Sequence, residues 1–357
     1  MKNKPILCWH LGYIPDFNIE TTETTYGSEI ALVYLSKIFT KKYRVIIFGP
    51  CLFNETIIDN IEYLNADKYE EFQKNNEIEI LILSRYINPI LDYELIAKKI
   101  FILIQDVYLL PFYKSISLPS DGKYVLKNFI DKIDGIITLT NWNKETFVNH
   151  YDIDPNKVFI IGNAIETTKF KNKIKKQKNK FIWTSHGGRG IEKLLEYFHE
   201  VRKRIPDAEL YIYRDRTAFS EEALDEMEKY DYFHYGGKIH NDKIIEEFQS
   251  SEMWFYPTNF TESCCISSLE AQMSKCVCVS TYLGGLIETV NNRGVLIKDT
   301  IWSEKYKKNI INEVVTIMND ENLKEKYREA GYNWAKEQSW KNISKKWFEL
   351  FELFDKK

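Results

Sequence analysis

The stretch FYPTNFTESCCISSLEAQMSKCVCVST, residues 255–281, places a helical pattern between two short apolar runs. The runs EMWFYPT (residues 252–258) and KCVCVST (residues 275–281) have the length and composition of buried strands. Continuous apolar strands separated by a helix predict a parallel sheet that is covered by helices on both faces. Two glutamates, Glu262 and Glu270, stand before and inside the helix, with seven residues between them.

The same alternation extends along the chain in both directions. In the first half, six strands are expected, in residues 5–11, 43–49, 78–84, 99–106, 134–140 and 157–164. In the second half, further strands are expected in residues 180–186, 208–214 and 293–298. The pattern from Ile301 onward is helical. It predicts an α/β protein with two Rossmann-like domains and a cleft between them at the strand carboxyl ends.

A lysine-rich segment, KFKNKIKKQKNK at residues 169–180, separates the two halves. It has no hydrophobic periodicity, which favours a solvated connector over a phosphate or membrane contact. We therefore predict an N-terminal domain at residues 1–166, a linker at 167–180 and a C-terminal domain at 181–337.

Composition excludes several classes of protein. The 357 residues include 49 Lys and Arg against 52 Asp and Glu, so a net charge of −3 gives no overall attraction to nucleic acid. No apolar run approaches the roughly 18 to 20 residues of a membrane span, and the N-terminus lacks the apolar core of a signal peptide. The six cysteines form neither a secreted framework nor a zinc pattern, which predicts reduced thiols and a cytoplasmic protein.

The turn HGGRG (residues 186–190) follows a predicted strand and opens a helix. Gly187 and Gly188 allow the backbone to approach a ligand, and the helix N-terminus favours an anion. Arg189 adds a planar cation that suits two phosphate oxygens. A tight turn with a surface arginine is the alternative.

The two glutamates have a functional and a structural interpretation. If Thr261 or Ser263 caps the helix, Glu262 lies at its mouth and Glu270 lies two turns inside, where it can accept hydrogen bonds from a ribose diol. The alternative is a capping carboxylate plus an exposed helix glutamate. Cys264 and Cys265 have no histidine partner in the sequence pattern, so we interpret them as small packing residues.

Three further positions are candidates for a site. The turn Gly284–Gly285 can present N–H groups to an anion or a hydroxylated ring. Gly27 and Ser28 begin a helix in the first half. Gln105, Asp106 and His10 each stand at a strand end, a placement that is typical of site residues in open α/β sheets.

Together these motifs resemble those of retaining glycosyltransferases of family 4. TESCCISSLEA resembles the Glu-x7-Glu motif of that family, and SHGGRGIEKLL resembles the turn and helix that open its donor domain. YFHYGGKIHNDKIIEEF, YLGGLIETV and IIGNAIETTKF resemble, in order, the base-binding segment, the closing glycine turn and the entry to the linker. The resemblance covers nearly the whole chain. It implies the GT-B fold of two facing Rossmann-like domains, with a final helix, about 338–357, that crosses back onto the N-terminal domain.

The resemblance also implies roles for particular residues. Arg189 would neutralise the donor diphosphate, Glu270 would bind the ribose and main chain near Ile239 would meet the base. Glu262, with the backbone of Cys264, Cys265 and Ile266, would hold the donor sugar and the pyrophosphate. Gly27 and Ser28, with Gly284 and Gly285, would lie on the sugar or acceptor side.

Three departures from the family pattern bear on the mechanism. The second cation of the site is not evident, which leaves Lys193 or Lys238 as candidates. Cys265 replaces a glycine, and Gln105 stands where the family usually has a catalytic histidine. Either His10 or Asp106 compensates, or the leaving diphosphate itself takes the acceptor proton in a front-face mechanism that needs no metal.

The predicted function is thus transfer of a sugar, as by a hexosyltransferase, from a nucleotide-sugar to a hydroxyl acceptor, with UDP as the default nucleotide and no cofactor. One alternative is a catalytically impaired glycosyltransferase-like subunit that binds a nucleotide-sugar or a partner protein. A nicotinamide dehydrogenase ranks lower because neither half shows G-x-G-x-x-G after a strand. Contact with a membrane surface through Lys114, Lys123 and Lys127 would suit a lipid-linked acceptor, although a solvated face fits these lysines as well.

Overall fold

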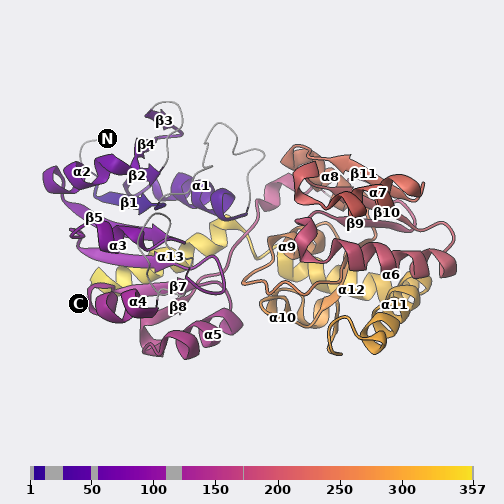
Figure 1. Cartoon of the computed structure of the whole chain (residues 1–357). Helices are drawn as coiled ribbons and strands as arrows, with labels where there is room; N and C mark the ends of the chain where they lie inside the picture. The colour runs from indigo at the N-terminus through magenta and orange to yellow at the C-terminus, as the bar shows by residue number, and fades with distance from the viewer. Residues whose placement is uncertain (1–3, 13–26, 50–54, 110–122, 172, 356–357) are drawn as a thin grey trace. The chain divides into compact units, whose positions relative to one another are not determined.

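The computed structural model describes residues 4–12, 27–49, 55–109, 123–171 and 173–355, and the chain divides into two compact units (Figure 1). The first unit comprises Met1–Asn163 together with Trp340–Lys357, and the second comprises Ala164–Ser339. Each unit is built on its own, almost entirely parallel sheet. The predicted pair of Rossmann-like α/β folds is therefore confirmed.

In the described part of the first unit, the sheet has eight strands in the order β3-β4-β2-β1-β5-β6-β7-β8. The strands are β1 (Ile6–His10), β2 (Arg44–Gly49), β3 (Thr56–Ile58), β4 (Ile61–Asn65), β5 (Ile78–Ser84), β6 (Lys99–Leu103), β7 (Gly135–Thr138) and β8 (Val158–Ile160). The antiparallel hairpin β3–β4 was not expected from the sequence. Asp59 and Asn60 form its turn with left-handed φ values of 54° and 62°, as tight hairpins require.

The first unit includes the last helix of the chain in addition to its own helices. The helices are α1 (Gly27–Phe39), α2 (Tyr69–Asn75), α3 (Asn88–Asp92), α4 (Lys123–Phe129), α5 (Asn141–Tyr151) and α13 (Trp340–Asp355). Trp347 of α13 lies 5.9 Å from Trp9 and 6.0 Å from Phe39, measured between ring centroids. Lys99 pairs with Asp355 at the end of the helix. The predicted return of the last helix to the N-terminal domain is thus confirmed.

In the second unit, the sheet has six strands among the described residues, in the order β11-β10-β9-β12-β13-β14, all paired in parallel. They are β9 (Lys180–Trp183), β10 (Glu209–Tyr213), β11 (Phe233–Gly237), β12 (Met253–Tyr256), β13 (Val277–Thr281) and β14 (Val295–Ile297). The edge strand β11 was not expected from the sequence. Its residues are interrupted by Gly236 and Gly237, which weaken a strand pattern.

The helices of the second unit bury the four central strands β9, β10, β12 and β13. They are α6 (Ile191–Arg204), α7 (Glu221–Lys229), α8 (Asn241–Ser250), α9 (Ile266–Met273), α10 (Leu286–Thr289), α11 (Glu304–Asn319) and α12 (Glu321–Ala335). Every residue of β9, β12 and β13 is buried. Packing on both faces holds these strands rigidly. The loops at their carboxyl ends are therefore held in defined positions, as a binding site requires.

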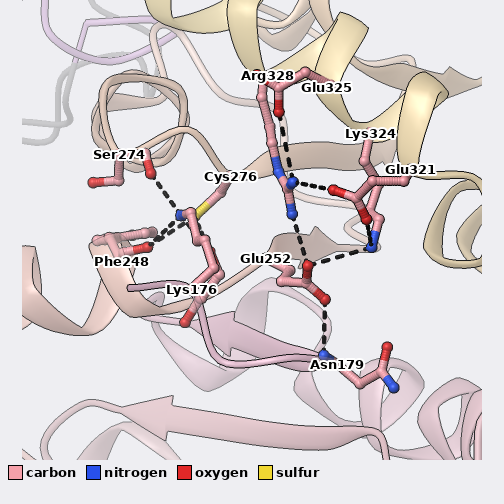
Figure 2. Close-up of polar contacts among 11 residues, drawn as sticks. Lys176, Asn179, Phe248, Glu252, Ser274, Cys276, Glu321, Lys324, Glu325 and Arg328 are labelled. Atoms are coloured by element: carbon pink, nitrogen blue, oxygen red, sulfur yellow. Dashed lines mark hydrogen bonds and ion pairs between the residues drawn. The ribbon is translucent and has the colours of Figure 1, made fainter. Parts of the chain in front are cut away.

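Most lysines of the lysine-rich segment are exposed, as expected for a solvated segment, and Lys176 and Lys180 are the exceptions. Lys176 is half-buried, and its ammonium donates to the carbonyl oxygens of Phe248, Ser251 and Ser274 at 3.3, 2.5 and 2.6 Å (Figure 2). The predicted linker at 167–180 lies within the second unit. The expectation of solvation was wrong at Lys176 because composition does not reveal which lysine finds carbonyl partners.

A buried network of charged side chains lies beside Lys176 (Figure 2). Glu252 accepts from Arg328 at 2.7 Å, from Lys324 at 3.3 Å and from the backbone N–H of Asn179 at 2.8 Å. The three charged side chains are each less than 9% exposed. The network ties α12 to the segments that lead into β9 and β12, so this helix is fixed to the sheet of the second unit.

Candidate active site

The glycine turn after β9 is fixed by close packing. An added Cβ at Gly187 would lie 2.5 Å from the carbonyl oxygen of Ala218, and one at Gly190 would lie 2.7 Å from that of Pro257. Gly190 also has φ +111°, which disfavours other residues. Because Ala218 follows β10 and Pro257 follows β12, three loops at the carboxyl edge of the sheet meet here.

Arg189 lies in this turn and is held by Glu262. Its Nη1 donates to Glu262 Oε1 at 2.7 Å, and the hydroxyl of Tyr256 donates to the same oxygen at 2.8 Å. The Glu262 side chain is 7% exposed, whereas that of Arg189 is 35% exposed. Burial lowers the pKa of Arg189, but the surrounding groups, with the Glu262 carboxylate first among them, together raise it above its ordinary value. A permanent cation is therefore presented at the carboxyl edge.

A second cation near this turn, Arg214, was not predicted from the sequence. It directly follows β10, and its charge acts on the turn: burial first, then Arg214 and Arg189, lower the pKa of His186. The pKa of Asp215 is lowered chiefly by the Thr217 hydroxyl and also by Lys238 and Arg214. An arginine immediately after a buried strand is the signal that could have identified it.

The other two candidates for the second cation differ in position. Lys193 pairs with Glu196 at 2.8 Å on α6, and Glu196 also binds Lys307 of α11. The Lys193 ammonium is therefore part of an exposed ion pair on α6. Lys238 is exposed directly after β11, and Ile239 beside it is half-buried against the core of the second unit.

The Glu262 loop leads into α9, which begins later than predicted. Its N-cap is Cys265, with no side-chain cap hydrogen bond, so neither Thr261 nor Ser263 caps it. Cys265 is 4% exposed, Cys264 is half-buried, and the Ser268 hydroxyl donates to the Cys265 carbonyl oxygen at 2.7 Å. The Ser268 N–H donates to the Cys265 carbonyl oxygen at 3.1 Å, and the N–H groups of Ile266 and Ser267 stand before it at the helix start, where N–H groups have no partner within the helix.

Glu270 lies little more than one turn inside α9. Burial raises the pKa of its carboxyl from 4.5 to about 7, although the residue keeps some exposed surface. Among the described residues, its carboxylate takes part in no hydrogen bond or ion pair. Thr184, at the end of β9, donates to Ser267 at 3.4 Å, which places the first turn of α9 beside the strand that carries the glycine turn.

The second glycine turn packs onto the Glu262 loop. The Gly285 N–H donates to the Glu262 carbonyl oxygen at 2.6 Å, so this N–H is not available to an anion as predicted. A Cβ at Gly284 would lie 2.5 Å from that oxygen, and one at Gly285 would lie 2.3 Å from the Ser263 carbonyl oxygen. The structure therefore joins Gly284 and Gly285 to Glu262, as support for the loop.

In the first unit, His10 is not an accessible base. It is 1% exposed, its Nδ1 accepts from the Gly12 N–H at 3.1 Å, and burial lowers its pKa to about 3. The ring packs against Phe48 and Tyr69. The expectation that His10 compensates for the missing histidine is wrong, because this strand-end side chain points into the core.

Gln105 and Asp106 also have partners. Gln105 is 9% exposed, and its Oε1 accepts from the side-chain amide of Asn163 at 3.1 Å. Asp106 is bound by Arg85 through two hydrogen bonds of 3.0 and 3.2 Å. Both oxygens of the Asp106 carboxylate thus accept a hydrogen bond from the same guanidinium.

Arg85 links several side chains at the carboxyl edge of the first sheet. It follows β5 with a left-handed φ of 65°, which is uncommon for a residue with a side chain. Besides Asp106, it reaches the Ser28 hydroxyl at 3.3 Å and Glu29 at 3.6 Å. Gly27 and Ser28 begin α1, so Arg85 connects the predicted helix start with the end of β6.

Comparisons with known proteins agree with this architecture. Residues 164–334, slightly less than half of the chain, match the family model described as glycosyl transferases group 1. A phosphatidylinositol N-acetylglucosaminyltransferase component from Arabidopsis thaliana is 24% identical over 229 residues, which is 62% of this chain. The match covers 50% of that relative, so the chain spans about half of its length.

Two solved structures share the whole fold. A glycosyltransferase from Rickettsia africae ESF-5 has a TM-score of 0.75 at 15% identity, over 99% of each chain. HepE from Anabaena, in complex with UDP, has a TM-score of 0.73 at 13% identity, over 98% of this chain and 99% of its own. These likenesses show the GT-B fold, and the family match supports a transferase.

The remaining predictions concern metal binding and contact with a membrane. Among the described residues, no group of three or more His, Cys, Asp or Glu side chains is arranged to hold a metal ion. In the same part of the chain, no helix has both the length and the apolar character to cross a membrane.

Proposed function

We propose that the chain is a retaining glycosyltransferase of family 4 that transfers a sugar from a nucleoside-diphosphate sugar to a hydroxyl acceptor. The observation that carries the proposal is the Arg189–Glu262 pair, set in a glycine turn at the carboxyl edge of the second sheet. A guanidinium fixed by a buried carboxylate is a preorganised site for a phosphate group.

The donor is held in the second unit. Arg189 and Arg214 offset the charge of the diphosphate, and the N–H groups at the start of α9 add a positive dipole end. Glu270 accepts hydrogen bonds from the ribose hydroxyls, which gives a role to a carboxylate that has no partner among the described residues. Main chain near Ile239 contacts the base, and the Glu262 loop lies against the donor sugar.

The chemical step relies on the leaving group. Gln105 cannot accept a proton, His10 is buried and Asp106 is ion-paired. In a front-face mechanism, the departing diphosphate oxygen accepts the proton of the acceptor hydroxyl, and the new bond forms on the face that the nucleotide leaves. The protein then works mainly by stabilising the leaving charge and aligning the acceptor, with no metal.

The nucleotide we propose is UDP, because the HepE structure of the same fold holds UDP. The name of the Arabidopsis relative suggests N-acetylglucosamine as the first donor sugar to test. Its acceptor, a phosphatidylinositol, makes a lipid-linked hydroxyl one candidate beside a glycan or a small molecule. We propose a cytoplasmic location, with contact at a membrane surface if the acceptor is lipid-linked.

A second candidate function is that of a catalytically impaired subunit. Gln105 in place of the usual histidine favours it, and the Arabidopsis relative is itself named as one component of a larger transferase. Such a chain would bind nucleotide-sugar or a partner protein without turnover.

Release of free nucleotide from a panel of UDP-, GDP- and ADP-sugars separates the two functions. An active transferase hydrolyses its donor slowly without acceptor, and Arg189→Ala should slow this release strongly. No release from any donor, together with saturable UDP binding, would favour the impaired subunit.

A further inference from the structure

Phe260 is an exposed aromatic residue in the loop between β12 and α9. Its side chain is 41% exposed, which is unusual for a large apolar residue of this unit. The Arg189 guanidinium carbon lies 4.1 Å from the centre of the ring. The ring therefore contacts the same side chain that the Glu262 carboxylate holds.

The position of the ring is fixed by the backbone beneath it. The Phe260 N–H donates to the Thr258 hydroxyl at 3.0 Å, and Thr258 is fully buried. Thr258 in turn exchanges two hydrogen bonds with the Thr281 hydroxyl on β13, at 3.0 and 2.7 Å. A rigid strand end thus sets the place of the ring over Arg189.

Arg189 is restrained in two directions at once. Glu262 binds one edge of the guanidinium plane, and Phe260 covers one face of it. A guanidinium carries five N–H donors in a planar fork, so a cover on its face leaves its other edges free to donate. Stacking also reduces the number of conformations that a long side chain must lose when a ligand binds.

We propose that Phe260 is a positioning residue that holds Arg189 in the conformation that binds the diphosphate of the donor. The inference rests on the proposed function and deepens it. Arg189 makes the contact with phosphate, and Phe260 acts only through Arg189. Because so much of the ring is exposed, it buries little apolar surface and contributes little to the stability of the fold. A role in ligand binding therefore accounts for its presence better than a role in stability does.

The test is UDP binding by isothermal titration calorimetry to the full chain. Phe260→Leu keeps the apolar volume but removes the aromatic face, and we expect it to weaken UDP binding roughly three- to thirty-fold. Phe260→Trp keeps the face and should restore near-wild-type affinity. Phe348→Leu is the matched control, because Lys42 lies 4.5 Å from that ring in the first unit, and it should leave UDP binding unchanged.

A double-mutant cycle separates positioning from a structural role. If Phe260 acts through Arg189, Phe260→Leu has no further effect on UDP affinity once Arg189→Ala is present. An additive loss in the double variant, or unchanged affinity in Phe260→Leu alone, would overturn the inference. If wild-type protein bound none of UDP, GDP and ADP, the proposed function itself would fail, which is a distinct result.

Discussion

Replacement of Glu270 by glutamine should stabilise the protein at alkaline pH while it weakens nucleotide binding. Burial raises the pKa of this carboxyl from 4.5 to about 7, and no described residue offsets the cost of its charge. Each pKa unit corresponds to about 1.4 kcal/mol, so ionisation of Glu270 destabilises the folded state by about 3 kcal/mol. The ionised Glu270 would thus lower the stability of the folded protein and raise its affinity for the nucleotide.

The pH dependence follows from the direction of the shift. Below pH 4.5 the carboxyl is protonated in both the folded and the unfolded chain, so it carries no cost. As the pH rises from 4.5 to about 7, the unfolded chain ionises first and the stability of the folded state falls. The cost is fully present above pH 7, and glutamine removes it.

Urea denaturation of wild type and Glu270→Gln, at about pH 4 and about pH 8, measures this difference. We expect the variant to be more stable by up to about 3 kcal/mol at the higher pH and nearly equal at the lower. Glu222→Gln, at an exposed position on α7, is the control and should show no difference at either pH. The assignment of Glu270 would be refuted if Glu270→Gln had the same stability as wild type at both pH values. It would also be refuted if the variant bound UDP as tightly as wild type.

Three further predictions follow from the same contacts. Arg189→Ala should reduce turnover about a hundred- to a thousandfold, since it removes a preorganised charge from the leaving group, and wild-type turnover in a donor-hydrolysis assay would contradict this. Arg328→Met should destabilise the second unit by about 3 kcal/mol, because Glu252 loses its strongest buried partner; an unchanged urea midpoint would contradict that role. Transferase activity should persist in EDTA, and its loss on chelation, with recovery on added Mg²⁺ or Mn²⁺, would contradict neutralisation by arginines.

Much of the fold could be predicted because local patterns determine it. Buried parallel strands are continuous apolar runs, so β5, β6, β9, β12 and β13 stand out from the helices between them. The hairpin β3–β4 was missed because its strands are short and partly exposed. The edge strand β11 was missed because glycines interrupt it.

The candidate site was only partly predictable, because its contacts join residues far apart in sequence. The glycine turn and the two glutamates have local signals, whereas the bond between Arg189 and Glu262 spans 73 positions. The pairing of Arg85 with Asp106 arises because β5 and β6 are neighbours in the sheet. His10 was misjudged because a strand that is buried on both faces gives no sign of where its last side chain points.

The most direct test of the central claim is a crystal structure of the protein grown with UDP. We predict that the diphosphate lies within hydrogen-bonding distance of Arg189 and that the ribose hydroxyls contact the Glu270 carboxylate. A nucleotide bound away from the carboxyl edge of the second sheet, with both side chains still in their present positions, would contradict the account.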